Sequence, residues 1–129
     1  MSSKIIQLGQ IWDLWFPYTT EPPDGKSRPA VIVGWSNFGR NEDELIWFVP
    51  ITSHSDGGKV RISEIPIEDY RIYNLSKPSW IRPRNIFSIA KSSFPRNTVP
   101  FGTIPTDMLL KIYEEMAMIV NPTDNFVSV

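Results

Sequence analysis

The decisive stretch of this sequence is Arg28-Pro29-Ala30-Val31-Ile32-Val33-Gly34-Trp35. From Ala30 to Trp35 the run is apolar at odd and even positions alike, which predicts a central strand covered on both faces. The segment before it, Thr19 to Ser27, is polar and rich in turn-forming residues, so it predicts a loop. We therefore expect a central strand that follows directly on a loop.

Arg28 stands where that loop meets that strand. Its guanidinium keeps its charge and presents forked donors, which suits a phosphate held against a rigid edge. The alternative is that Arg28 caps the strand and pairs with Glu21 or Asp24. Taken alone, the residue favours the second interpretation.

On both sides of this stretch, strand-like segments alternate with clusters of Gly, Pro, Asn and Asp, the pattern of a small β-barrel or sandwich. The predicted strands are Gln10–Phe16, Leu45–Thr52, Val60–Ile65, Ser79–Arg82 and Asn85–Ala90, with an exposed loop at Asn37–Glu44 and a turn at Ser55–Gly58. Pro50 cannot donate a hydrogen bond to a neighbouring strand, so we expect a bulge or the end of pairing on one side there.

The periodicity becomes helical near the end of the chain. Apolar residues recur at helical spacing at Leu109, Ile112, Met116 and Ile119. Thr103 or Thr106 offers a cap, Asp107 suits the positive end of the helix dipole, and Asn121-Pro122 ends the helix and leaves 121–129 as a tail. We predict a single domain over residues 1–129, mainly β, built as a small antiparallel β-barrel with one C-terminal helix.

Composition excludes several classes of protein. The chain has 129 residues and no cysteine, so disulfides, thiol nucleophiles and thiolate zinc sites are excluded. A single histidine, His54, excludes a histidine-rich metal site, and no phosphate-binding glycine loop or nucleophile elbow is present. No segment has the length of a secretory signal core or a membrane span, so we expect a cytoplasmic protein.

The formal net charge of -1 conceals an uneven distribution. Residues 1–69 hold six Lys or Arg against ten Asp or Glu, whereas residues 70–106 hold six bases and no acid. Such a basic segment favours a surface that binds nucleic acid. The alternative is that folding pairs these bases with acids elsewhere in the chain.

One further group of polar residues, Thr52-Ser53-His54, ends the third predicted strand. Alternation along a strand puts Thr52 and His54 on one face. His54 has an unperturbed pKa near neutrality, so it can exchange a proton at physiological pH. The alternative is an exposed histidine in a polar turn.

Five segments occur in an order that resembles the MazF/PemK family, the toxin halves of bacterial type II toxin–antitoxin pairs. They are Leu8–Trp12, Lys26–Val33, Val49–Ser53, Ser79–Ile81 with Asn85–Ile89, and Phe101–Ile104. The resemblance extends from about Leu8 to Ile119, and the ordered set is more specific than any one segment. It implies a CcdB/MazF-like toxin fold, which is a small SH3-like barrel with a C-terminal helix, and a homodimer.

The resemblance also implies a metal-independent endoribonuclease, without cofactor, that cleaves single-stranded RNA, inhibits translation and growth, and has an antitoxin protein as its partner. The catalytic positions of the family fall on Arg28 and Thr52, which would stabilise the charge that develops when a ribose 2′-hydroxyl attacks the adjacent phosphorus. His54 is a further catalytic candidate, as proton acceptor. The residues expected to bind RNA are Lys26, Ser53, Arg82, Arg84 and Asn85.

Two other functions compete with this one. A gyrase-poisoning toxin of the same fold acts through a C-terminus that contains tryptophan, whereas this chain ends Asn125-Phe126-Val127-Ser128-Val129. A catalytically inactive SH3-like binding module is the second, because a fold does not fix a function. In that case the tryptophans would line a ligand groove; they are Trp12, Trp15, Trp35, Trp47 and Trp80.

Overall fold

The computed structural model describes residues 5–17, 25–36, 44–53, 60, 63–122 and 124–129. Its strands are β1 (Gln10–Pro17), β2 (Gly25–Ser36), β3 (Leu45–Ser53), β4 (Ile65–Ile67), β5 (Ser79–Ile81), β6 (Phe87–Ala90) and β7 (Gly102–Thr103). Its helices are the 3-10 turns η2 (Tyr70–Tyr73) and η3 (Lys91–Ser93) and the α-helix α1 (Thr106–Val120). His54, the turn at 55–58 and most of the loop expected over 37–44 lie outside the described residues.

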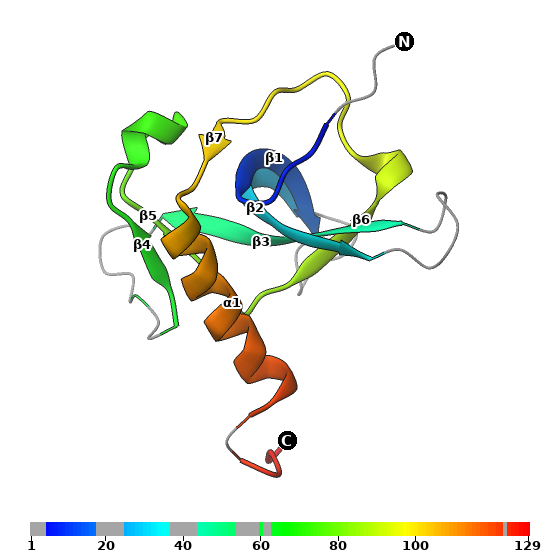
Figure 1. Ribbon diagram of the computed structural model, residues 1–129, viewed down its shortest axis with the longest axis vertical. Helices are drawn as coiled ribbons and strands as arrows, with labels where there is room; N and C mark the ends of the chain where they lie inside the picture. Colours follow the sequence, from blue (N-terminus) through cyan, green and yellow to red (C-terminus); the bar gives the residue numbers. More distant parts are fainter. Residues whose placement is uncertain (1–4, 18–24, 37–43, 54–59, 61–62, 123) are drawn as a thin grey trace.

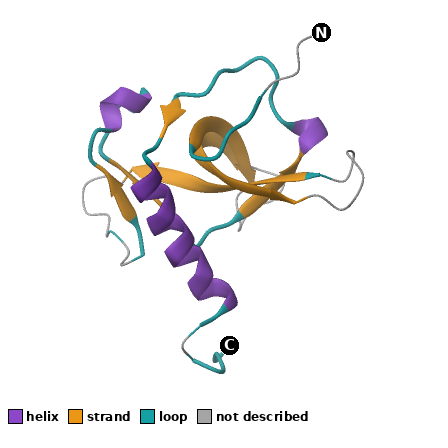
Figure 2. Ribbon diagram, in the orientation of Figure 1, coloured by secondary structure: helices purple, strands orange, loops and turns teal. Residues whose placement is uncertain are grey.

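The strands form one strongly curled antiparallel sheet, with α1 packed on one side of it (Figure 1, Figure 2). The strand order is β4-β5-β3-β2-β1-β7, and β6 pairs with the free side of β3 next to β5. The prediction of a mainly β protein with a curled antiparallel sheet and one C-terminal helix is therefore confirmed.

β2 lies in the middle of the sheet and supplies both halves of the core. Val31 and Val33 point into a cluster covered by α1 and η2. Ala30 and Ile32 point to the opposite face, into a cluster with Trp12 and the aromatic rings around β6. All four side chains are buried, so the expectation drawn from their apolar character at both parities is correct.

The predicted bounds of β1 and β3 are correct to within one residue, but those of β2 are not. β2 begins at Gly25, so Gly25–Ser27, expected in a loop, belong to the strand. The cause is pairing: β1 continues to Pro17 and holds the segment from Gly25 to Pro29 as its partner. Arg28 is therefore the fourth residue of a paired strand rather than a residue at a loop boundary.

The strand predicted at Val60–Ile65 is wrong for the residues described there. Ser63 and Glu64 lie outside any strand, and β4 covers Ile65–Ile67, paired only with β5. Glu64 faces inward instead, because its carboxylate pairs with Arg82 at 3.2 Å. The weaker strands near 79–82 and 85–90 are present, shortened to β5 and β6.

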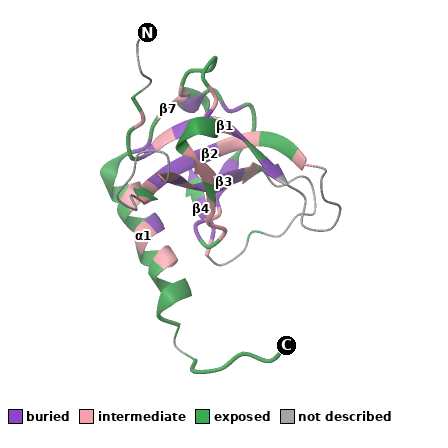
Figure 3. Cartoon of the chain, turned by 90° about the vertical axis from the view of Figure 1, so that its right-hand side faces the viewer, coloured by how far each residue is buried: buried purple, intermediate pink, exposed green. Residues whose placement is uncertain are grey.

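α1 starts at Thr106 and ends before Asn121, whose N–H donates to the Ala117 carbonyl at 3.0 Å. Its N-cap is Pro105, with no side-chain capping bond, so the expected threonine cap is wrong. The helix is held on the β-sheet by packing, because Ile112 is fully buried in the core. The C-terminal half of the helix extends beyond the sheet, and its last turns are exposed (Figure 3).

Candidate functional site

The ends of β2 and β3 meet at one edge of the curled sheet. The two strands pair up to Ala30 opposite Pro50, and there the ladder stops. This confirms the expectation for Pro50, which has no N–H; its carbonyl accepts instead from the Arg82 N–H at 2.9 Å. Arg28 and Thr52 each lie two residues beyond this last pair, Arg28 on β2 and Thr52 on β3.

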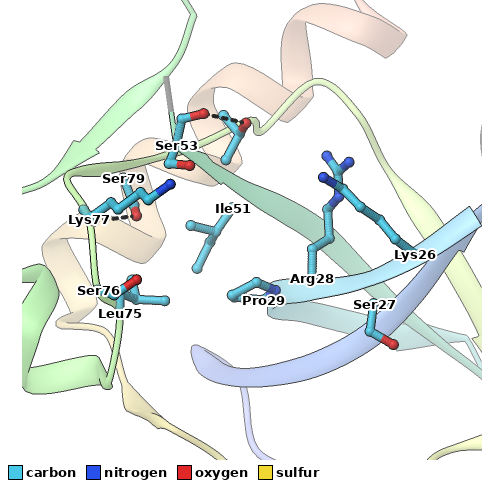
Figure 4. A pocket seen from close by; sticks show the side chains of 11 residues that line it. Lys26, Ser27, Arg28, Pro29, Ile51, Ser53, Leu75, Ser76, Lys77 and Ser79 are labelled. Atoms are coloured by element: carbon cyan, nitrogen blue, oxygen red, sulfur yellow. Dashed lines mark hydrogen bonds between the residues drawn. The ribbon is translucent and has the colours of Figure 1, made fainter. Parts of the chain in front are cut away.

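A pocket of about 300 Å³ occupies this edge (Figure 4). It is lined by Lys26, Ser27, Arg28, Pro29, Ile51, Thr52, Ser53, Leu75, Ser76, Lys77 and Ser79. One wall comes from β2, one from the end of β3, and the third from the segment between η2 and β5. Residues up to 53 positions apart in the sequence therefore form a single site.

Arg28 is held in place by aromatic side chains. It sits opposite Leu14 in the β1–β2 ladder, and its guanidinium carbon lies 5.7 Å from the centroid of the Phe16 ring. Phe16 is itself fixed by edge-to-face contacts with Phe48 at 5.2 Å and Phe87 at 4.9 Å. Such a contact fixes the cation and leaves its N–H groups free to donate.

The Nε atom of Arg28 is buried and has no hydrogen-bond partner among the described residues. A buried donor without a partner is unfavourable by about 1–3 kcal/mol, so such groups call for an explanation. Because this atom has no exposed surface, an anion in the pocket would have to bind the terminal nitrogens of Arg28 instead. Glu21 and Asp24, the partners in the strand-cap interpretation, lie outside the described residues.

Thr52 contributes a hydroxyl to the same pocket. Its Oγ1 donates only to the Ser53 carbonyl, over 3.4 Å, which is long for an O–H···O bond. The hydroxyl can therefore turn to a better acceptor. Ser53 also lines the pocket, and β5 holds this end of β3 through pairs at Ile51, Thr52 and Ser53.

The pocket is positively charged although the chain as a whole is slightly acidic. Lys26, Arg28 and Lys77 line it, and no Asp or Glu among the described residues does. The ion pairs of the described region involve none of these three bases. A concave site with three cations attracts anions, and its walls concentrate the field.

Four of the site residues expected from the sequence thus come together: Lys26, Arg28, Thr52 and Ser53. Arg82, Arg84 and Asn85 do not line the pocket. Arg82 pairs with the buried Glu64, and Arg84 pairs with Glu115 of α1 at 2.8 Å. Both arginines thus form ion pairs with acids from elsewhere in the chain, which is the alternative interpretation of the basic segment. A role for them in binding RNA stays a prediction.

Sequence reasoning missed the third wall. Lys77 is one of the six bases of segment 70–106, and neither Ser76 nor Ser79 was expected at the site. Nothing local marks them, because they reach the pocket through the fold of η2 and the pairing of β5 with β3. Their only signal was the basic and polar character of the segment before the buried residue Ile81.

The remaining titratable groups of the described residues add no catalytic candidate near the pocket. Burial raises the pKa of Tyr113, whose hydroxyl donates to the Val33 carbonyl at 2.8 Å. Burial, and the negative charge of Asp69, raise the pKa of Tyr73. Within the described ranges, no three His, Cys, Asp or Glu side chains gather as metal ligands. No helix in those ranges has the length and apolar character to span a membrane.

These features define a small curled-sheet protein with a cationic pocket at one sheet edge, and known structures share the fold. MazF (Form-I) from Deinococcus radiodurans matches with a TM-score of 0.64 at 18% identity, over 92% of this chain and 99% of the other. MazF in the MazE-MazF complex (Form-III) of the same organism matches with a TM-score of 0.62 at 18% identity, over 92% and 98%. A comparison with curated proteins finds no match.

The family follows from the sequence itself. A family model described as "PemK-like, MazF-like toxin of type II toxin-antitoxin system" matches residues 7–120. The chain therefore belongs to this toxin family, and the resemblance noted in its sequence is confirmed. The matched residues contain every wall of the pocket.

Proposed function

We propose that this chain is a metal-independent endoribonuclease, the toxin of a type II toxin–antitoxin pair, and that it cleaves single-stranded RNA in the cytoplasm. The observation that carries the proposal is the cationic pocket that Arg28 lines together with Thr52, Lys26 and Lys77. Family membership supports the reaction class.

In the proposed reaction the ribose 2′-hydroxyl attacks the adjacent phosphorus, and the bond to the 5′-oxygen of the next nucleotide breaks. The products are a 2′,3′-cyclic phosphate and a 5′-hydroxyl. Arg28 donates to the phosphoryl oxygens as negative charge builds on them, and the Thr52 hydroxyl adds a further donor. Donors fixed before reaction in this way are worth about 10²–10³ in rate each.

Proton transfer needs a different group, since an arginine stays protonated. His54 follows Ser53 directly in the chain and is its only histidine. We assign it as the candidate acceptor for the 2′-hydroxyl proton. A cleavage rate that rises with pH through the histidine range and is flat in His54→Ala would support this role.

The proposed partners are a second copy of the chain and an antitoxin. MazF from Deinococcus radiodurans has been solved together with MazE, and the fold is shared. An acidic antitoxin segment that folds on binding would complement the three pocket cations and cover Arg28. Crosslinking of the antitoxin only to a face remote from Arg28 would contradict this mode of inhibition.

The experiment that tests the function uses the purified wild-type chain with a single-stranded RNA transcript in EDTA. We expect cleavage that EDTA does not reduce, with 2′,3′-cyclic phosphate and 5′-hydroxyl ends identified by mass spectrometry. An oligonucleotide with a single 2′-deoxyribose at the cleaved position is the control and should stay intact. Cleavage of that control, or ends with a 5′-phosphate, would refute the mechanism.

A further inference from the structure

The pocket has a second cationic wall that the proposed reaction does not use. Lys77 lies across Ile51 from Arg28 and Lys26, which stand together on the β2 side (Figure 4). Ser76 and Ser79 flank it on the same wall. Between the two walls, apolar side chains line the pocket; they are Pro29, Ile51 and Leu75.

The backbone around Lys77 is held at both ends. Leu75 is buried in the core and its N–H donates to the Tyr70 carbonyl at 3.3 Å. Two residues after Lys77, Ser79 is buried and paired with Ser53 of β3, and its hydroxyl donates to the Lys77 carbonyl at 2.8 Å. Lys77 therefore starts from a fixed Cα, although its own side chain is exposed.

This arrangement fits a polynucleotide better than a single anion. A nucleic-acid strand carries phosphates separated by a sugar, from which the base projects to the side, so two successive phosphates need cations on both sides of a less polar stretch. The two walls and the apolar residues between them match that alternation. A lysine suits the outer contact, because its compact charge on a flexible stem accepts a phosphate in several orientations.

We propose that Lys77 binds a phosphate next to the one that is cleaved, with Ser79 as the positioning residue that holds its backbone. The proposal rests on the function proposed above. Lys77 would act by holding the strand across the pocket while Arg28 engages the reacting phosphate. Since it contacts only the phosphate backbone, it would strengthen binding without selecting a base.

The first test measures binding without cleavage. The probe is a fluorescein-labelled mixed-sequence DNA decamer, which has no 2′-hydroxyl, titrated at several NaCl concentrations. In the full-length chain, Lys77→Met should weaken binding and flatten the plot of log K against log salt by about 0.7, the slope of one phosphate contact on a single strand. Lys111→Met, an exposed helix position outside the pocket, is the matched control and should leave the slope unchanged.

The second test locates the phosphate in a cleavable RNA that spans a cut site mapped with the wild-type chain. Neutral methylphosphonates replace the phosphates on either side of that site, one at a time. At one of the two positions Lys77→Met and the methylphosphonate should each lower kcat/KM about tenfold, and together no further. Equal salt slopes for the wild type and Lys77→Met, or additive losses at both positions, would overturn the proposal.

The two hypotheses fail in different ways. A wild-type chain that binds the decamer but cuts no RNA refutes the proposed function, while the salt slopes still decide the role of Lys77. A wild-type chain that cuts RNA but shows no slope change in Lys77→Met refutes the Lys77 role alone. A wild-type chain that neither cuts RNA nor binds the decamer in a salt-dependent way refutes both.

Discussion

Arg82 and Arg84 lie two residues apart in the chain but in different environments. We expect Arg82→Met to lose more stability than Arg84→Met. The Glu64 side chain that Arg82 contacts is 1% exposed, and Arg82 itself is 22% exposed. A hydrogen bond to a charged group is worth about 1.5–3 kcal/mol, and the partial exposure of Arg82 places the expected loss near 2 kcal/mol. At about 2.1 cal/mol/K per residue, this lowers the Tm of a 129-residue chain by about 7 °C.

Arg84→Met is the matched control for this prediction. The distance from Arg84 to Glu115 is 2.8 Å, shorter than the 3.2 Å from Arg82 to Glu64, but the Arg84 and Glu115 side chains are 44% and 32% exposed. Pairs of this kind contribute less than about 1 kcal/mol, so the Tm should fall by no more than about 4 °C. Thermal unfolding followed by circular dichroism measures both variants. Equal Tm losses, or a larger loss for Arg84→Met, would show that burial of Glu64 does not set the strength of the Arg82 contact.

Two further predictions concern α1. Ile112→Ala leaves a cavity at a fully buried position and should destabilise the chain by about 3 kcal/mol. Leu110→Ala, at an exposed position of the same helix, is the control and should change stability far less. Urea unfolding measures both variants. Tyr113→Phe removes the bond to the Val33 carbonyl and should cost about 1 kcal/mol at neutral pH. Because burial raises the pKa of Tyr113, its contribution is complete below the unfolded value of about 10 and is lost as the pH rises through the folded value. The alkaline loss of stability should therefore be shallower in Tyr113→Phe, and an unchanged pH profile would contradict the assignment.

The core strands could be predicted from the sequence because burial there leaves a pattern. A strand apolar at both parities has to be covered on both faces, and the burial of Ala30 to Val33 bears this out. The start of β2 could not be predicted in this way. Gly25 to Ser27 are polar, and they are extended because β1 provides a partner, which composition does not record.

The candidate site also has residues that could be predicted from the sequence and residues that could not. Arg28 and Thr52 lie on adjacent strands, each two residues beyond the last β2–β3 pair, and the family resemblance was enough to pair them. Lys77 reaches the pocket through the packing of η2 and the β3–β5 ladder, which no local signal predicts. The partners of Arg82 and Arg84 lie 18 and 31 residues away, so the charge count alone did not show which bases would be paired.

The tryptophans show why a binding groove was a weaker prediction. Trp12 is 1% exposed and belongs to the core, as expected for a strand residue of a small barrel. Trp15 and Trp35 are about half exposed, yet neither lines the pocket. The side chains that converge on the pocket are cations and hydroxyls rather than indoles, and this favours phosphate chemistry over recognition by an aromatic groove.

The central claim is that Arg28 stabilises the charge that develops on the cleaved phosphate. The most direct measurement is the single-turnover rate of RNA cleavage by Arg28→Met in EDTA, beside Thr52→Val and the wild type. We expect the Arg28→Met rate to fall about 10²–10³-fold and the Thr52→Val rate to fall less, the scale of losing one preorganised donor. Both variants should keep a Tm close to that of the wild type. An Arg28→Met chain that cleaves RNA at the wild-type rate would contradict the account.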